Sequence, residues 1–181
     1  MLTQLQTRKL TRLFTLYDAD GNGLLEERDY DAVARNGARA LGYDPGTAEY
    51  ATLHGAYMGI WQGVRHLADS NNDQQLTLDE FLAAYDKLIG QREVFTAVIL
   101  DMAKMTIAFQ DKNKDGKVEL AEHVAYDMAH NIRREEAVES FRQLDRDGDG
   151  YLTNAELIED IDEFFYSDDP QAPGNWLLGP F

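Results

Sequence analysis

The sequence predicts an all-α protein built from four helix–loop–helix units that are grouped in two pairs. Apolar side chains recur at spacings of three and four along most of the chain, which is the pattern of amphipathic helices. Four short stretches rich in Asp, Asn and Gly interrupt this pattern, and they begin at Asp18, Asp69, Asp111 and Asp145. A repeat of this kind indicates one supersecondary unit that occurs four times.

The apolar stripes locate the longer helices. The dipeptide Asp44-Pro45 predicts the start of one helix, because Asp is a good N-cap and Pro fits the first helical position. We expect three stripes to pack in the core and to bind no ligand: Tyr50, Leu53, Tyr57, Ile60, Trp61, Val64 and Leu67; Val94, Val98, Met102, Met105 and Phe109; and Leu157, Ile161, Phe164 and Phe165. A boundary near Gly90 divides the chain into an N-terminal pair of units, residues 1–90, and a C-terminal pair, residues 91–181.

Charge is the most unusual property of the composition. Of 181 residues, 17 are Lys or Arg and 33 are Asp or Glu, which gives a net charge of −16. A field of this sign repels phosphate, so we expect neither nucleic acid nor a membrane as partner, and cations are favoured instead. The lack of cysteine excludes disulfides and thiolate metal sites. Because the first residues do not form a signal peptide and no apolar run could span a bilayer, we expect a cytoplasmic protein.

The four loops carry oxygen atoms at the positions that a calcium site requires. Calcium takes about six to eight oxygen ligands, and an EF-hand loop supplies them from positions 1, 3, 5, 7, 9 and 12. Position 7 gives a backbone carbonyl, position 12 gives a bidentate carboxylate, and Gly at position 6 permits a left-handed turn. The third and fourth loops match at every ligand position. Their predicted ligands are Asp111, Asn113, Asp115, Lys117, Glu119 and Glu122 in residues 111–122, and Asp145, Asp147, Asp149, Tyr151, Thr153 and Glu156 in residues 145–156.

The first loop, residues 18–29, departs from the pattern at its last position. Its predicted ligands are Asp18, Asp20, Asn22, Leu24, Glu26 and Asp29, so Asp replaces Glu at position 12. Asp is one methylene shorter, and a smaller cage suits octahedral magnesium better than it suits calcium. We expect this loop to bind calcium with weaker discrimination against magnesium. The alternative is a structural loop without metal.

The second loop, residues 69–80, departs from the pattern at its turn. Its predicted ligands are Asp69, Asn71, Asp73, Gln75, Thr77 and Glu80. Gln74 stands where Gly is expected, and a non-glycine residue in the left-handed region costs about 1 kcal/mol. This strain weakens a site without abolishing it. The sequence therefore leaves the occupancy of this loop open and predicts three or four calcium ions in total.

Position 8 of each loop predicts how the loops pair. It is apolar in all four: Leu25, Leu76, Val118 and Leu152. Such residues allow two loops to form a short antiparallel ladder, the first with the second and the third with the fourth. Thr77 with Glu80, and Thr153 with Glu156, also match the capping box of a helix start. We therefore expect the same residues to cap the exiting helices and to bind metal.

The chain resembles the sarcoplasmic calcium-binding protein family, including its calexcitin-like and calerythrin-like members, over nearly its whole length. The resemblance rests on the first loop with Asp29 at its end, on residues 61–69 before the second loop, and on residues 165–180. It implies a compact globule of two EF-hand pairs in which a C-terminal tail, residues 166–181, covers the apolar surface. Members of this family mostly buffer calcium, and one of their loops is often degenerate.

Calcium buffering is the function that the sequence favours. A sensor exposes a Met-rich groove when it binds calcium. This chain has five Met, including the initiator, and its tail residues Trp176, Leu177 and Leu178 can fill such a groove from within. We therefore expect a monomeric buffer whose folding calcium stabilises. The alternative is a calcium sensor that exposes an apolar surface and binds a target protein, although the sequence does not indicate a target.

The sequence does not predict an enzyme. The four His, at positions 54, 66, 123 and 130, lie in helical segments without a partnering pattern, and no nucleophile motif is present. A core or surface position on a helix is the simpler explanation for each His. A luciferin-binding protein of related fold is a further alternative, and a bound organic chromophore would support it.

Overall fold

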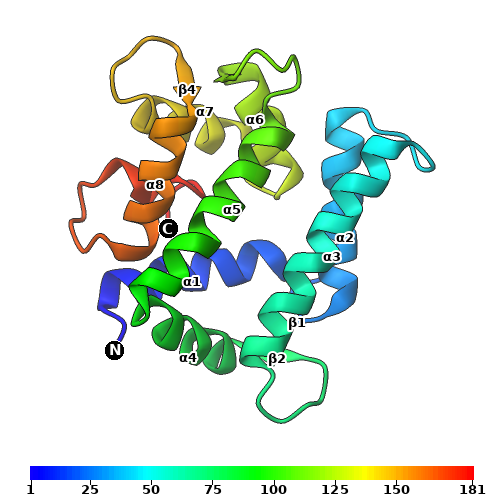
Figure 1. Ribbon diagram of the computed structural model, residues 1–181, viewed down its shortest axis with the longest axis vertical. Helices are drawn as coiled ribbons and strands as arrows, with labels where there is room; N and C mark the ends of the chain where they lie inside the picture. Colours follow the sequence, from blue (N-terminus) through cyan, green and yellow to red (C-terminus); the bar gives the residue numbers. More distant parts are fainter.

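The protein has the predicted architecture of four helix–loop–helix units (Figure 1). The computed structural model describes the backbone of residues 1–181 and every side chain except those of Ile99 and Met102, so Met102 of the second predicted stripe lies outside the described side chains. In chain order the elements are α1 (Gln4–Tyr17), β1 (Leu24–Leu25), α2 (Glu27–Leu41), α3 (Ala48–Ala68), β2 (Leu76–Thr77), α4 (Leu78–Ile89), α5 (Arg92–Gln110), β3 (Lys117–Glu119), α6 (Leu120–Ala129), α7 (Arg134–Leu144), β4 (Tyr151–Thr153), α8 (Asn154–Tyr166) and the 3₁₀ helix η1 (Pro173–Trp176).

Each loop begins and ends on a helix cap. The first residue of every loop is the C-cap of the entering helix, and its N–H donates to the carbonyl four residues earlier. The ninth residue is the N-cap of the exiting helix, and the twelfth residue closes a capping box with it. This confirms the capping boxes predicted at Thr77 and Thr153. Glu26 and Glu119 are the corresponding N-cap residues after the first and third loops.

The loops pair in the predicted way. Strands β1 and β2 are antiparallel with Leu25 opposite Leu76, and β3 and β4 are antiparallel with Val118 opposite Leu152. All four side chains are fully buried beneath their loops. In Figure 1 the label of β4 lies at one end of the molecule and those of β1 and β2 lie at the other. The two loop pairs are therefore far apart, and helices connect them.

Helix α3 starts later than the sequence predicts. It begins at Ala48, where the hydroxyl of Thr47 accepts the N–H of Tyr50 at 3.2 Å. The predicted start at Asp44-Pro45 is instead a turn, closed by the N–H of Thr47 donating to the carbonyl of Asp44 at 3.1 Å. Gly46 has a left-handed backbone with φ of 96°, which a helix starting at Pro45 could not contain.

One apolar core includes side chains from both halves of the chain. An aromatic group connects α4, α5 and α8: the ring of Phe165 stacks on Tyr85 at a centroid distance of 5.8 Å and meets Phe95 edge-on at 5.0 Å. Helix α1 contacts both α4 and α8. The division of the chain at Gly90 stays a prediction.

Three of the stripe residues do not lie in the core. Leu67, Val94 and Val98 are exposed at 54%, 58% and 41%, so their predicted burial is wrong. Helix α5 buries Phe95 and Ala103 instead. Because α5 carries apolar residues on more than one face, their spacing does not determine which face meets the core. Leu67 and Val98 line a groove between α3, α4 and α5.

The C-terminal tail is held against the helices by buried polar contacts. Lys9 of α1 is fully buried, and its ammonium donates to the carbonyls of Glu163 at 3.1 Å and Ser167 at 2.9 Å, and to the side-chain oxygen of Asn175 at 3.1 Å. Burial lowers the pKa of Lys9 to about 8. Ser140 of α7 donates to the carbonyl of Trp176 at 2.7 Å. The predicted tail cover is thus confirmed, and α1 anchors it.

A buried hydrogen bond joins the N-terminal and C-terminal pairs. The hydroxyl of Tyr57 in α3 contacts Nε2 of His130, which is the C-cap of α6. Nδ1 of His130 lies 2.9 Å from the carbonyl of Tyr126. Since the carbonyl can only accept, Nδ1 carries the proton and Nε2 accepts from Tyr57. Burial lowers the pKa of His130, so the imidazole is held neutral.

We expect the stabilising effect of His130 to decrease below neutral pH. A His whose pKa is lower in the folded state binds its proton mainly after unfolding, so its contribution to the free energy of unfolding starts to fall below its unfolded pKa of about 6.5 and is lost as the pH approaches its lower folded pKa. The variant His130→Gln keeps an acceptor for Tyr57 but cannot titrate. Urea unfolding of the calcium-loaded protein between pH 7.5 and 5 measures the difference.

The stability gap between the native protein and His130→Gln should narrow as the pH falls. His66→Gln is the matched control, because His66 is exposed. A gap that stays constant over this range would contradict the buried neutral imidazole.

Candidate metal centres

All four loops fold around the carboxylate at position 1. In the fourth loop, Oδ1 of Asp145 accepts the N–H of Asp149 at 3.1 Å and Oδ2 accepts the N–H of Gly150 at 3.0 Å. The first, second and third loops repeat this pair of hydrogen bonds at 2.9 to 3.2 Å. Each loop therefore curls in the same way around its first carboxylate.

The carboxylate at position 12 ties the two ends of each loop together. In the third loop, Oε1 of Glu122 accepts the N–H of Lys112 at 2.9 Å and Oε2 accepts the N–H of Glu119 at 3.0 Å. In the fourth loop, Oε1 of Glu156 accepts the N–H of Arg146 at 3.3 Å, and Oε2 accepts from Thr153. These are positions 2 and 9, so the exiting helix cannot rotate independently of the loop.

The shorter Asp29 makes the same contacts in the first loop. It accepts the N–H of Ala19 at 3.2 Å and that of Glu26 at 2.8 Å. Asp29 is almost fully buried, and burial raises the pKa of its carboxyl group. Asp29 therefore reaches both ends of the loop despite its shorter side chain.

Two positions in every loop adopt a left-handed backbone. At position 6 the φ angles are 83°, 68°, 85° and 88° for Gly23, Gln74, Gly116 and Gly150, so Gln74 is strained as predicted. Position 4 is also left-handed, a requirement that the ligand spacing does not reveal. The residues there are Gly21, Asn72, Lys114 and Gly148, with φ of 70°, 60°, 61° and 71°. The second loop therefore carries two strained residues, the third carries one, and the first and fourth carry none.

The side-chain oxygens fit a hard divalent cation best in the first and fourth loops. Carboxylate oxygens of Asp18, Asp20 and Asp29 lie within 4.8 Å of one another, and so do those of Asp145, Asp147 and Asp149. The second and third loops have an amide, Asn71 and Asn113, in place of the second Asp. Several charged oxygens at such short distances repel one another unless a cation lies between them, and oxygen-rich sets of this kind suit calcium.

Two polar neighbours of the metal ligands could not be predicted from the sequence. The guanidinium of Arg28 contacts Glu26 and lies 3.2 Å from Oδ2 of Asp20. It therefore competes with a metal ion for the carboxylates of the first loop. Ser70 donates to Oε1 of Glu80 at 2.9 Å. Hydrogen bonds from Thr77 and Ser70 lower the pKa of Glu80. Arg28 and Ser70 occupy loop positions that carry no ligand, which is why the spacing rule does not reveal them.

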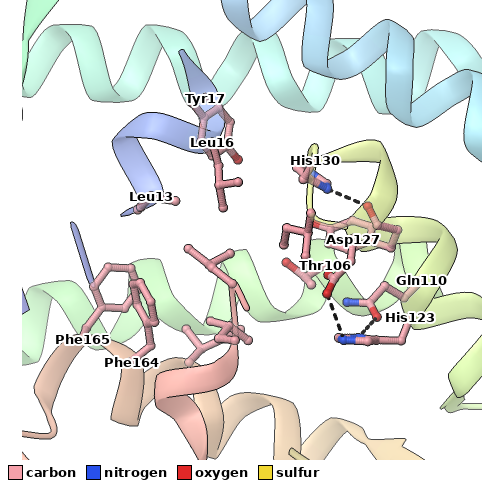
Figure 2. Close-up of a pocket in the computed structure, with 15 residues that line it drawn as sticks. Leu13, Leu16, Tyr17, Thr106, Gln110, His123, Asp127, His130, Phe164 and Phe165 are labelled. Carbon is pink, nitrogen blue, oxygen red and sulfur yellow. Dashed lines mark hydrogen bonds and ion pairs between the residues drawn. The ribbon is translucent and has the colours of Figure 1, made fainter. Parts of the chain in front are cut away.

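A separate cavity lies in the interior between α1, α5, α6, α8 and the tail (Figure 2). Its volume is about 80 Å³, and mainly apolar side chains line it. At one end, Nδ1 of His123 lies 3.1 Å from Oε1 of Gln110 and its Nε2 lies 3.2 Å from Oδ2 of Asp127. Ligand pockets usually have volumes of about 300–1,000 Å³, so this cavity does not fit an organic chromophore.

Comparisons with known proteins agree with this geometry. The family model described as EF hand matches residues 138–161. The chain is 33% identical over 168 residues to calerythrin of Saccharopolyspora erythraea, which covers 92% of this chain and 95% of calerythrin. It is 27% identical over 175 residues to sarcoplasmic calcium-binding protein 1 of Astacus leptodactylus, covering 91% of this chain and 90% of that protein. A solved calcium-binding protein of Streptomyces coelicolor superposes with a TM-score of 0.75 at 25% identity, covering 88% of this chain and 97% of that one.

The fold and the loops define a calcium-binding protein of the EF-hand type. Its relatives are calcium-binding proteins rather than enzymes, in agreement with the sequence analysis. More narrowly, the chain belongs to the sarcoplasmic calcium-binding protein family and is similar to calerythrin. No helix in the described part of the chain is both long and apolar enough to cross a membrane.

We predict that Gln74→Gly stabilises the protein. Relief of the left-handed strain raises the free energy of unfolding by about 1–2 kcal/mol. The added flexibility of the unfolded chain lowers it by about 0.5–1 kcal/mol. The free energy of unfolding should therefore rise by up to about 1.5 kcal/mol, and each kcal/mol raises Tm by roughly 2–4 °C in a chain of this size. Thermal unfolding in excess calcium measures the change.

Gln74→Ala is the matched control, because it removes the same side chain but keeps the Cβ atom. It should give no comparable rise in Tm. Equal stabilisation by both variants would show that the Gln side chain, rather than the backbone conformation, is the cause.

Proposed function

We propose that this protein is a calcium buffer that binds three or four calcium ions and that calcium binding stabilises its fold. The ligands are the oxygens at positions 1, 3, 5, 7, 9 and 12 of the four loops, as assigned in the sequence analysis. The observation that supports the proposal is the hydrogen-bond pattern at the position-1 carboxylate, which is repeated in all four loops. We also propose a monomeric, cytoplasmic protein, as the composition led us to expect.

The tail supports buffering over target recognition. Leu177 and Leu178 lie against the interior cavity together with Leu13, Leu16 and Phe164. A surface that the chain's own tail covers is not available to a target helix. A buffer needs only the ions, whereas a sensor needs a surface that opens.

The loops are not equivalent in this proposal. The third and fourth loops have the full ligand set, and the first loop, with its shorter Asp29, also accepts magnesium. The second loop is the last to fill, because Asn72 and Gln74 are both strained and its ligand set includes only three carboxylates. Three ions therefore bind more strongly than the fourth.

Removal of calcium should loosen the protein, most of all in its C-terminal pair. That pair carries 20 acidic and 9 basic side chains, and its carboxylates repel one another without a cation. A ligand present at about 100 times its Kd stabilises by about 2.7 kcal/mol per site, so Tm should fall by roughly 5–10 °C for each site emptied. Circular dichroism melts with calcium and with a chelator measure this.

The variant Glu156→Gln should lose part of the calcium-dependent rise in Tm. Glu135→Gln is the control, because Glu135 is exposed and outside the loops, and it should keep the whole rise. A native Tm that does not depend on calcium would contradict the proposed function.

A calcium sensor is the second candidate, and two observations favour it. The Streptomyces coelicolor relative was studied for calcium-mediated regulation in prokaryotes. In this chain, an apolar groove of about 240 Å³ lies open between α3, α4 and α5, near the exposed side chains of Leu67 and Val98. This groove is lined by α3 and α4 of the N-terminal pair and by α5 of the C-terminal pair, and by none of the tail residues.

Dye binding separates the two functions. A buffer should bind a fluorescent apolar-surface dye no more strongly with calcium than with magnesium alone, because calcium opens no new apolar surface in it. A rise of several-fold on adding calcium would favour the sensor and contradict the buffer. The variant Val98→Glu, which places a charge at the groove, identifies whether any rise comes from this surface.

A further inference from the structure

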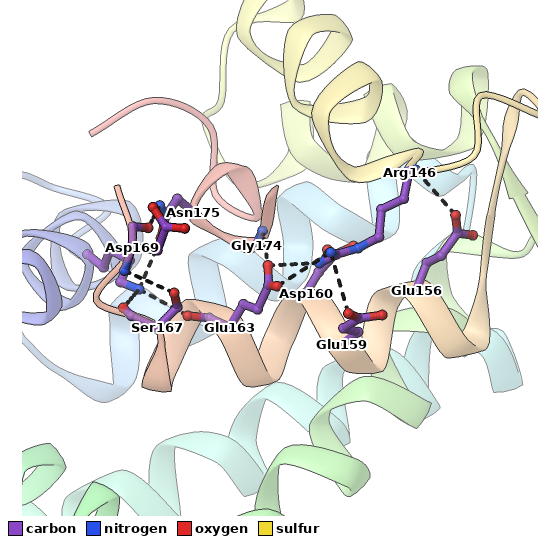
Figure 3. Close-up of polar contacts among 10 residues, drawn as sticks. Arg146, Glu156, Glu159, Asp160, Glu163, Ser167, Asp169, Gly174 and Asn175 are labelled. Atoms are coloured by element: carbon purple, nitrogen blue, oxygen red, sulfur yellow. Dashed lines mark hydrogen bonds and ion pairs between the residues drawn. The ribbon is translucent and has the colours of Figure 1, made fainter. Parts of the chain in front are cut away.

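Arg146 connects the fourth loop to helix α8. It is residue 2 of the loop, between the predicted ligands Asp145 and Asp147. Its side chain turns away from the loop centre (Figure 3), and Nη2 lies 2.6 Å from Oδ1 of Asp160 and 2.8 Å from Oε2 of Glu163. The side chain of Asp160 is fully buried and that of Arg146 is mostly buried, so these ion pairs are poorly screened by solvent.

Glu163 in turn connects helix α8 to the tail. Its Oε2 atom, which pairs with Arg146, also accepts the N–H of Gly174 at 2.9 Å. The tail approaches α8 so closely here that a Cβ atom on Gly174 would lie 2.3 Å from the carbonyl oxygen of Asp160 and 2.6 Å from Cβ of Glu163. One carboxylate oxygen is therefore shared between the fourth loop and the tail.

We propose that Arg146 is a positioning residue that couples calcium binding in the fourth loop to docking of the C-terminal tail. The tail here means residues 167–181. The coupling rests on the proposed calcium site in residues 145–156. It runs through the contacts of Arg146 with Glu163 and of Glu163 with Gly174.

The sign of the coupling follows from the geometry. Asp145 and Asp147 flank Arg146, so both ends of its backbone become fixed when these residues hold a calcium ion. The calcium ion also neutralises part of the negative charge of the loop. This charge otherwise competes with Glu163 for the guanidinium of Arg146. Both effects strengthen the contact with Glu163 and hence the docking of Gly174. By linkage, a docked tail raises the calcium affinity of the fourth loop by the same factor.

Hydrogen exchange of the tail in the full-length protein tests the first direction. The amides of Gly174 and Asn175 should exchange about tenfold more slowly with calcium than with a chelator, which lies within the usual range of coupling energies. Arg146→Met keeps the apolar stem but removes the charge, and it should abolish most of this difference. Arg142→Met is the matched control, because the exposed Arg142 lies on α7 and pairs with Glu139 of the same helix.

Calorimetric calcium titration tests the reciprocal direction. Gly174→Ala pushes the tail away from α8 without touching the loop, and it should weaken calcium binding at the fourth site about fivefold or more. Gly59→Ala is the control, because Gly59 also lies in an ordered segment but has open space around its Cβ position. The heat that disappears in Glu156→Gln identifies the fourth site.

The outcomes separate this inference from the proposed function. If no loop binds calcium, the proposed function fails. If calcium binds but tail exchange does not change in the native protein, or changes equally in Arg146→Met and Arg142→Met, the coupling alone is wrong. Should Arg146→Met fail to fold, Glu163→Gln weakens the same contact from the other side and must reduce the difference as well.

Discussion

The carboxylate at position 12 of each loop is the contact on which the rest of the structure depends. It lies in the first turn of the exiting helix and binds backbone N–H groups at both ends of the loop, as Glu122 does with Lys112 and Glu119. It therefore fixes the direction of the helix relative to the loop before any packing is considered. The same two oxygens are the predicted bidentate ligand, so helix geometry and metal binding share one group.

Strain distinguishes the loops more clearly than their ligand sets do. Each loop needs two left-handed residues, and glycine supplies both only in the first and fourth loops. The second loop instead uses Asn72 and Gln74, and the third uses Lys114 at one of the two positions. Because every loop still adopts the same curl, the buried ladder residues and the helix caps must outweigh this strain. A loop with an imperfect sequence is thus held in shape by its partner loop.

The two ends of the chain close the molecule over the C-terminal pair. Lys9 from the first helix satisfies three oxygens at the end of α8 and in the tail, and Arg8 donates to the carbonyl of Phe181 at 2.9 Å. A fully buried ammonium is costly unless all its protons are bonded, and here all three are. The tail is therefore a specific part of the fold rather than a loose extension, and Arg146 brings a calcium loop into contact with it.

The loops, their pairing and the caps of the exiting helices could all be predicted from the amino-acid sequence. These features depend on residues close together in the chain, since a loop of twelve residues contains its own ligands, turn and cap. The spacing rule was incomplete for position 4, where Lys114 shows that the backbone requirement does not demand glycine. Only the tertiary structure decided which faces of α3 and α5 are buried, so Val98 is exposed although its stripe predicted burial. It also decided the partners of Lys9, because those oxygens are more than 150 residues away in sequence, where local pattern carries no information.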